Sequence, residues 1–324
     1  MHISIVIPAY NAAAWIADAI RSVLAQSHAD WRLVVVDDGS MDATGDIVAS
    51  FANTRITLVR QSNAGVSSAR NRGIEEICRQ APFRLQEGDG RSGVLFLDAD
   101  DQLTPDALSR LAAALKGSTS AVAAVGPYTF GHTSRARGPD SGDLLPVLLV
   151  RNLFANGGHV LMRSQALLAA GRFRTDIAYG EDWEFWIRVA LQGPFAAVAG
   201  MAPVLYVRRH DMGAYRRLAT DPASFAPCMD AIFGNPALLV RFGATRLAAI
   251  RRRTDAENAW IIGRELIRHG DTREGRVWLR RSVRAAPSLK RAALLAVSLF
   301  PIGPFVPYAA AGRGNFACNE PTRP

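Results

Sequence analysis

The chain has 324 residues, of which 49% are hydrophobic and 21% charged, so it is long and apolar enough to bury at least one large core. Its cysteines are few, far apart and odd in number, which argues against a disulfide scaffold and is typical of a reducing compartment. The net charge of +9 is concentrated in residues 206–291, which hold 18 Arg and Lys residues but 8 Asp and Glu residues. Such a basic segment indicates either a negative partner or solvated helix faces.

The first half of the chain alternates β-branched runs with helical stretches, which predicts an α/β fold with a mostly parallel sheet flanked by helices. Strands are expected at residues 3–8, 32–40, 55–60 and 93–98. Helices are expected at residues 15–24, 66–78 and 104–115, the last one with Thr104 as its N-cap.

Polar residues follow three of these strands, in the segments 8–11 (PAYN), 37–40 (DDGS) and 98–101 (DADD). In open sheets of this kind, ligands bind beyond the carboxyl ends of the strands. The loop after the first strand contains neither the glycines of a dinucleotide-binding loop nor the Gly and Lys of a P-loop. A divalent cation held by carboxylates is therefore expected to take the place of a backbone phosphate cradle.

The strongest candidate binding site for that cation is the acidic run Asp98, Asp100 and Asp101. Carboxylates crowded this closely resist joint ionisation, so a cation is expected beside them. Mg²⁺ and Mn²⁺ prefer such oxygen ligands. The alternative is an ordinary polar turn between a strand and a helix, where Asp is common. An EF-hand is disfavoured, because Leu103 stands where its loop requires Gly.

Two further motifs have both a functional and a structural interpretation. One carboxylate of Asp37 and Asp38 would accept a hydrogen bond from a nucleobase or a ribose hydroxyl, although Asp-Gly-Ser is also a common turn. Arg70 lies in register with the apolar residues of its helix, so its charge must find a carboxylate or phosphate, or reach water.

Glu181 and Asp182 begin a predicted helix, where acidic residues are favoured by the helix dipole alone. The functional alternative is that Asp182 is a general base about 3 Å from an acceptor hydroxyl. His210 follows a short predicted strand and two arginines. It would either bind a diphosphate or a metal, or be an ordinary surface or core residue, and the sequence favours neither. The His and Cys residues do not cluster at zinc-ligand spacing.

Taken in order over residues 3–210, these segments resemble the family 2 glycosyltransferases of the GT-A fold. The resemblance implies an inverting, metal-dependent enzyme that moves one sugar from a nucleoside-diphosphate sugar, with UDP as the expected nucleotide. The acceptor would be a hydroxyl of a saccharide or lipid-linked cell-envelope, capsule or exopolysaccharide molecule. The Q-x-x-R-W motif of the processive members is absent, which favours the transfer of single sugars.

The resemblance also assigns residues, all of them at positions that match the family motifs. It implies that the donor is bound by Pro8, Ala9, Tyr10, Asn11, Asp37, Asp38, Arg70, Asp98 and Ala99. Asp38 would contact the base and Asp98 the ribose. The ligands of Mn²⁺ or Mg²⁺ would be Asp100, Asp101 and His210, and Asp182 would be the catalytic base.

We expect four parts along the chain: a catalytic domain at 1–215, a linker at 216–236, a helical extension at 237–291 and an apolar, Pro-rich tail at 292–324. The extension resembles one tetratricopeptide hairpin, which cannot bury its own apolar face alone. Its arginines would face an anionic membrane or a lipid diphosphate, or would only keep the helices soluble. The tail would dock on the body of the protein or dip into a membrane surface.

No signal peptide is recognised at the start of the sequence, so a cytoplasmic protein is expected, with peripheral contact at the inner face of the plasma membrane as an open alternative. Two other functions are kept beside the leading hypothesis: a nucleotidyltransferase with the same type of sheet, and a non-catalytic adaptor. Nucleic-acid binding ranks lowest, because charge is its only support.

Overall fold

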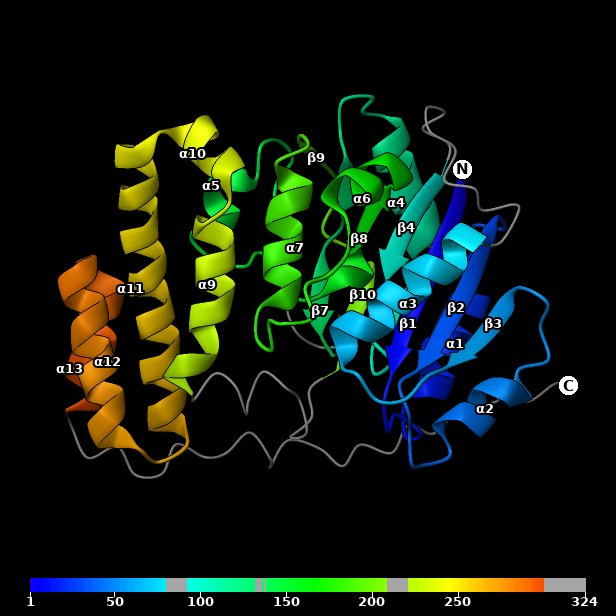
Figure 1. Ribbon diagram of the computed structural model, residues 1–324, viewed down its shortest axis with the longest axis horizontal. Coiled ribbons are helices and arrows are strands. Elements are labelled where there is room, and N and C mark those ends of the chain that lie inside the picture. The colour runs from blue at the N-terminus through cyan, green and yellow to red at the C-terminus, as the bar shows by residue number, and fades with distance from the viewer. Residues whose placement is uncertain (80–91, 132–135, 137, 209–220, 300–324) are drawn as a thin grey trace, which may run out of the picture. The chain divides into compact units, whose positions relative to one another are not determined.

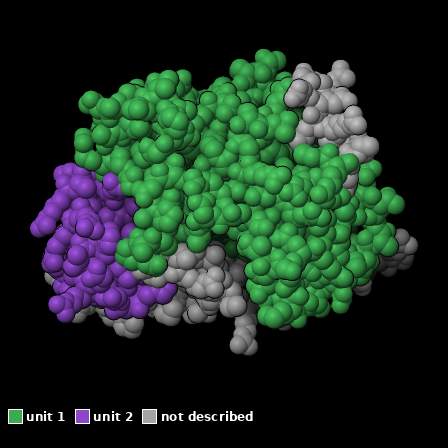
Figure 2. Space-filling view, viewed as in Figure 1, with its two compact units in different colours: residues 1–254 green, residues 255–324 purple. Residues whose placement is uncertain are grey.

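The computed structural model of the chain describes residues 1–79, 92–131, 136, 138–208 and 221–299 (Figure 1). The chain forms two compact units, Met1–Thr254 and Asp255–Pro324 (Figure 2).

The first unit is built on a seven-stranded sheet of order β3-β2-β1-β4-β8-β6-β9. Its four parallel strands are those expected from the sequence: β1 (His2–Ala9), β2 (Trp31–Asp37), β3 (Ile56–Arg60) and β4 (Ser92–Phe96). Strand β8 (Val160–Arg163) runs antiparallel to both β4 and β6 (Ala123–Val125), and β9 (Phe195–Ala197) pairs in parallel with β6. The α/β fold with a mostly parallel sheet is thus confirmed.

Alternate side chains of β1 enter two separate cores, one on each face of the sheet. Ile3, Ile5 and Ile7 pack with helices α1 (Ile16–Leu24) and α4 (Ala107–Lys116). Val6 belongs to the other core, which contains helices α3 (Val66–Arg79), α6 (Ser164–Ala170) and α7 (Glu181–Ala190). Burial on both faces explains why these strands have nearly continuous apolar sequences.

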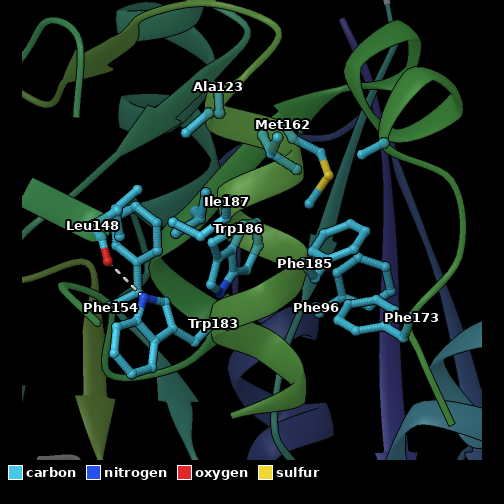
Figure 3. Packing of buried hydrophobic residues seen from close by; sticks show 14 of the residues in the cluster. Phe96, Ala123, Leu148, Phe154, Met162, Phe173, Trp183, Phe185, Trp186 and Ile187 are labelled. Carbon is cyan, nitrogen blue, oxygen red and sulfur yellow. Dashed lines mark hydrogen bonds between the residues drawn. The ribbon is translucent and has the colours of Figure 1, made fainter. Parts of the chain in front are cut away.

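The second of these cores fixes α7 against β4 through aromatic side chains (Figure 3). The rings of Phe173 and Phe185 stack with centroids 4.0 Å apart, and Phe96 at the end of β4 meets both rings edge-on. The indole of Trp183 donates a hydrogen bond to the Leu148 carbonyl oxygen at 2.6 Å. The first turn of α7 is therefore held in place by packing beside the end of β4.

A second, three-stranded sheet has the order β5-β10-β7, and its strand β5 follows β4 closely in the chain. It consists of β5 (Gln102–Leu103), β10 (Leu205–Val207) and β7 (Tyr128–Phe130). This sheet explains a correction to the predicted start of α4. Thr104 donates its N–H to Val204 O at 3.0 Å and so continues the sheet, and Asp106 occupies the N-cap position instead.

The remaining helices of the first unit are short: α2 (Thr44–Ser50), α5 (Leu145–Leu148), the 3-10 helices η2 (Gly157–His159) and η3 (Pro222–Phe225), α9 (Ala226–Phe233) and α10 (Pro236–Phe242). The segment expected as a linker, 216–236, is largely helical from Pro222 onwards. Cys228, Met229 and Ile232 are buried in the core there. The compact units thus divide at a different place from the domain boundaries expected from the sequence, which remain predictions.

The second unit contains three helices in its described residues. The long helix α11 (Ala244–Arg268) crosses the division between the units, and α12 (Thr272–Ala285) and α13 (Leu289–Ser298) follow. Gly263 and Gly275 let α11 and α12 approach closely, because a Cβ on either one would lie 2.7 Å from the carbonyl oxygen of the other. The helical extension is therefore present, while its tetratricopeptide character remains a prediction.

Among the described residues, no helix taken singly has the length and hydropathy needed to cross a bilayer. The pair Pro222–Phe233 and Pro236–Phe242 meets that criterion only when its members are taken together, and they are bent by 63°.

The close approach of α3 to β1 yields a stability prediction. A Cβ on Gly73 would overlap Cγ1 of Val6, a stiff and fully buried side chain. We expect Gly73→Ala to lower the free energy of unfolding by roughly 1 kcal/mol or more, as overpacking does. This loss would appear despite the gain of about 1 kcal/mol in helix propensity that Ala has over Gly.

Urea unfolding followed by circular dichroism measures this change. The matched control is Gly117→Ala, at the exposed end of α4, where the backbone has a φ of −71° and the new Cβ would meet nothing nearer than 3.4 Å. The control should stay within about 0.5 kcal/mol of the wild type. Equal stability of the two variants would contradict the packing of α3 on β1.

Candidate active site

The acidic run lies at the carboxyl end of β4, as expected for a ligand site in this type of sheet. One carboxylate oxygen from each of Asp98, Asp100 and Asp101 lies within 4.8 Å of the others. Burial raises the pKa of Asp101 well above its usual value, and the charges of Asp100 and Asp98 raise it further. A cluster of oxygen donors with excess negative charge fits the ligand preference of Mg²⁺ or Mn²⁺.

Both carboxylate oxygens of Asp101 are bonded to the protein. Oδ1 accepts the backbone N–H of Arg208 at 2.8 Å, and Oδ2 accepts the side-chain amide of Asn156. The guanidinium of Arg208 donates to Asp100 O at 3.0 Å and to Asp18 at 3.1 Å. These bonds tie the end of β10 to the acidic turn, so Asp101 has a structural role whether or not it also contacts a metal.

Arg70 resolves one alternative that the sequence left open. Its guanidinium does not reach water, since the side chain is 6% exposed, but lies between two carboxylates. Nη2 donates to Asp98 Oδ1 at 3.2 Å, and Nη1 donates to Glu181 Oε1 at 3.0 Å. Burial raises the pKa of Asp98, while the positive charge of Arg70 lowers it. Arg70 is therefore one cation beside the acidic run, and the expected divalent metal remains a prediction.

Asp182 lies in the first turn of α7, next to Glu181. Its two carboxylate oxygens are each 3.4 Å from the side-chain nitrogen of Asn152. Asn152 accepts the N–H of Phe154 through its own oxygen at 3.1 Å, which directs its amide nitrogen toward Asp182. Burial, reinforced by the charge of Glu181, raises the pKa of Asp182 to about 7, against the opposing charge of Arg70. A carboxylate with this pKa suits general-base chemistry near neutral pH.

Asp38 is buried, and in this structure it organises a loop. Its carboxylate accepts hydrogen bonds from the Gln61 side chain at 2.7 Å and from the N–H groups of Ala64 and Gly65, each at 2.9 Å. Asp37 similarly accepts the N–H of Ser40 at 3.0 Å. These bonds shape the turn after β2 and the loop before α3. The predicted contact of Asp38 with a nucleobase remains a prediction.

The segment 8–11 reaches the same edge of the sheet. Pro8 and Ala9 complete β1, and Ala9 O accepts the N–H of Asp38 at 2.8 Å. The next side chain, Tyr10, is 47% exposed. Asn11 has a φ of 47°, and its side chain accepts the N–H of Met41 at 2.8 Å. An aromatic ring thus stands exposed at the sheet edge beside a turn held in an uncommon conformation.

The structure brings together the ends of β1, β2 and β4, with Arg70 and Asp182 beside them. Ala99 is buried within the acidic turn, whereas His210 lies outside the described residues. Three contributors were not singled out from the sequence: Asn152, Asn156 and the side chain of Arg208. Isolated Asn and Arg residues give no sequence signal of this kind, because their partners are 30 to 190 positions away.

Two comparisons with known proteins concern the sequence. The family model described as "Glycosyl transferase family 2" matches residues 4–170, about half of the chain. A relative from Bacillus subtilis, "Putative teichuronic acid biosynthesis glycosyltransferase TuaG", is 37% identical over 111 residues, which are 33% of this chain and 39% of TuaG. The chain thus aligns with about two fifths of that relative's length.

Solved structures show the same fold. S. aureus TarS 1-349 superposes with a TM-score of 0.61 at 18% identity, over 92% of this chain and 87% of TarS 1-349, and it has also been solved with UDP and with UDP-GlcNAc. The mannosyltransferase PcManGT from Pyrobaculum calidifontis, in complex with GDP-Man and Mn²⁺, superposes with a TM-score of 0.54 at 20% identity, over 93% and 81% of the two chains. With the sheet order and the family match over residues 4–170, we conclude that this chain belongs to glycosyl transferase family 2 and has the GT-A fold.

Proposed function

We propose that this chain transfers a single sugar, with inversion, from a nucleoside-diphosphate sugar to a hydroxyl group of a cell-envelope, capsule or exopolysaccharide acceptor. The observation that carries the proposal is the cluster of Asp98, Asp100 and Asp101 at the end of β4. Asp182 lies near this cluster, since the charge of Asp98 raises its pKa. A donor site and a base therefore share one edge of the sheet.

The donor would lie along the carboxyl ends of β1, β2 and β4. Asp37, Asp38 and the segment 8–11 would bind the nucleoside, with Asp98 at the ribose. Asp100 and Asp101 are the proposed ligands of a divalent cation, since their carboxylates belong to one cluster of oxygen donors. His210 is proposed as a further ligand on the sequence motif alone. When bound, Mn²⁺ or Mg²⁺ supplies positive charge that stabilises a leaving diphosphate. UDP is the expected nucleotide, and the solved structures of TarS 1-349 with UDP support that choice.

Asp182 would act on the acceptor. Its carboxylate takes the proton of the acceptor hydroxyl while the oxygen bonds to the anomeric carbon, and the bond from that carbon to the diphosphate oxygen breaks. Attack from the face opposite the diphosphate inverts the configuration. Asn152 holds the carboxylate through its amide nitrogen, and the pKa of about 7 keeps Asp182 basic enough to accept a proton.

The acceptor class is supported by the relative TuaG, whose name places it in teichuronic acid biosynthesis. A lipid-linked acceptor would bring the enzyme to a membrane surface. Helix α12 presents exposed arginines for that purpose: Arg273, Arg280 and Arg284 recur at helical spacing around the exposed Val277. We propose that this side of α12 lies on the surface of an anionic bilayer, as a peripheral contact at the cytoplasmic face of the plasma membrane.

Two other functions were kept open on the sequence. A nucleotidyltransferase would need a basic, Gly-rich loop after β1, and the segment 8–15 has neither property. A non-catalytic adaptor would not need a buried carboxylate whose pKa is raised to about 7 beside an acidic cluster. Membership of a glycosyltransferase family favours sugar transfer over both alternatives.

The donor site can be tested by calorimetric titration with UDP, GDP, dTDP and CDP, each with Mn²⁺ and again with EDTA. We expect selective binding of one nucleotide that EDTA abolishes. Asp100→Asn should weaken it by at least about tenfold, since even residues outside the first coordination sphere of a metal act on that scale. Asp46→Asn is the control, because its side chain is 88% exposed and pairs only weakly with Arg60 at 3.3 Å. Absence of binding to all four nucleotides would sink the donor site.

The base can be tested with Asp182→Asn. Turnover should fall by about 10² to 10⁴, the usual contribution of a general base, while the Kd of the donor stays unchanged. Donor hydrolysis, measured as release of the nucleoside diphosphate, serves as the assay until an acceptor is identified. Asp176→Asn is the control, because that exposed carboxylate pairs with Arg174 in the loop before α7.

The same assay gives a pH dependence. Since Asp182 must be deprotonated to accept a proton, kcat/KM of the wild type should fall about tenfold per pH unit below about 7 and level off above it. Full activity of Asp182→Asn at any pH would refute the assignment.

The membrane surface can be tested by sedimentation with phosphatidylglycerol vesicles. The double variant Arg280→Glu/Arg284→Glu should bind at least about 30-fold more weakly, because each basic residue near an anionic surface contributes about 1 kcal/mol. Arg79→Glu/Arg241→Glu changes the net charge equally at exposed positions of the first unit and should bind like the wild type. Equal loss in both variants would show a charge effect without a defined surface.

A further inference from the structure

The ion pairs of Arg70 join three elements that are far apart in the sequence. Arg70 comes from α3, Asp98 follows β4, and Glu181 opens α7. Both bonds use separate nitrogens of one planar guanidinium, at 3.2 Å and 3.0 Å, and the pairing would be lost if α7 shifted away from β4. The proposed base, Asp182, is the next residue after Glu181.

We propose that Arg70 and Glu181 form a brace that holds the first turn of α7, and with it the Asp182 carboxylate, against the donor-binding end of β4. This inference rests on the proposed function, because it assigns a positioning role to two residues beside the proposed base. In the proposed reaction neither side chain would contact the transferred sugar. They would act through the place and the charge of Asp182.

Stability alone does not account for this arrangement. Arg70 lies on the apolar side of α3, over the ring of Phe173 at 5.2 Å, where an aliphatic side chain would pack as well. Buried ion pairs contribute little net stability compared with apolar residues of the same size. Arg70 Nε is moreover buried and has no hydrogen-bond partner in the described parts of the chain, which is a further cost. A function in fixing geometry explains why charge is present at this position.

The brace also acts on Asp182 electrostatically, and its two halves act in opposite directions. The charge of Glu181 raises the pKa of Asp182, whereas the charge of Arg70 lowers it. Among the residues that the structure describes, the other titratable groups around Asp182 are Asp98, which raises its pKa, and the thiol of Cys228 on α9. Removal of Glu181 should therefore lower the pKa of Asp182, and removal of Arg70 should raise it.

The chain offers a matched control on the same helix. Glu184, one turn after Glu181, is buried and pairs with Arg188 at 2.8 Å. Arg188 also donates to Ala170 O and Arg172 O, so this pair fastens α7 to the segment after α6. Loss of Glu184 should cost stability as the loss of Glu181 does, but it should leave Asp182 in place.

The test compares Glu181→Gln, Arg70→Lys and Arg70→Met with Glu184→Gln. Calorimetry gives the donor Kd, and donor hydrolysis gives kcat and the pH dependence of kcat/KM. We expect Glu181→Gln to lower kcat about 10- to 100-fold, the scale of a misplacement of about 1 Å, with little change in the donor Kd. Arg70→Lys should lower kcat on the same scale and also weaken donor binding, because Arg70 pairs with Asp98, the proposed ribose contact. Lys keeps the charge but lacks the planar guanidinium that directs two separate nitrogens at the two carboxylates.

The pH profiles separate positioning from a general loss of structure. The acid limb of kcat/KM should move to lower pH in Glu181→Gln, to higher pH in Arg70→Met, and not at all in Glu184→Gln. If Arg70→Met does not fold, the proposal is still tested by the acid limb of kcat/KM, which should shift in Glu181→Gln and stay unchanged in Glu184→Gln. The same kcat and the same limb in Glu181→Gln and Glu184→Gln would overturn the proposal.

Failure of the brace and failure of the proposed function give different results. If Asp182→Asn hydrolyses the donor as fast as the wild type, the proposed base is wrong. The brace is still tested in that case by ¹³C NMR titration of labelled aspartate carboxylates, with the Asp182 signal assigned from its loss in Asp182→Asn. An Asp182 midpoint that is the same in Glu181→Gln and the wild type would overturn the brace independently of activity.

Discussion

Repulsion among Asp98, Asp100 and Asp101 is the constraint on which the rest of the site depends. Three carboxylates within 4.8 Å of one another must be compensated, and the compensating groups come from distant parts of the chain. Arg70 arrives on α3, Asn156 lies just before η2, and the N–H of Arg208 follows β10. Folding therefore joins these segments at one end of β4, and the polar site forms together with the topology.

The site is rigid because its polar and apolar residues lie on the same elements. Phe96 ends β4 two positions before Asp98, and its ring packs against Phe185, which lies one turn after Asp182 on α7. A displacement of either carboxylate would disturb a close-packed aromatic core, in which small shifts are costly. Core packing thereby sets the position of α7 beside β4, and the proposed brace of Arg70 and Glu181 would fix the first turn of α7 within that frame.

Much of the fold could be predicted from the sequence, because buried parallel strands and amphipathic helices leave clear periodic patterns. The four parallel strands and helix α3 lie where these patterns place them. The start of α4 was predicted wrongly, since Thr104 fits both a cap and a short strand, and tertiary pairing with Val204 decides between them. The partners of Asp101 were beyond prediction for a similar reason. Asn156 and Arg208 lie 55 and 107 positions from Asp101 in the sequence, and tertiary folding brings them to its carboxylate. No local sequence pattern indicates such contacts.

Glu181 and Asp182 show how neighbouring residues of similar chemistry can have different roles. Sequence alone gives both the same favourable place at a helix N-terminus. In the structure Glu181 faces the guanidinium of Arg70 and is held as an ion-paired carboxylate, while Asp182 is placed against the neutral amide of Asn152. Neighbouring acids whose environments differ in this way can take distinct chemical roles. The choice of Asp182 over Glu181 as the proposed base thus follows from which partner each carboxylate meets.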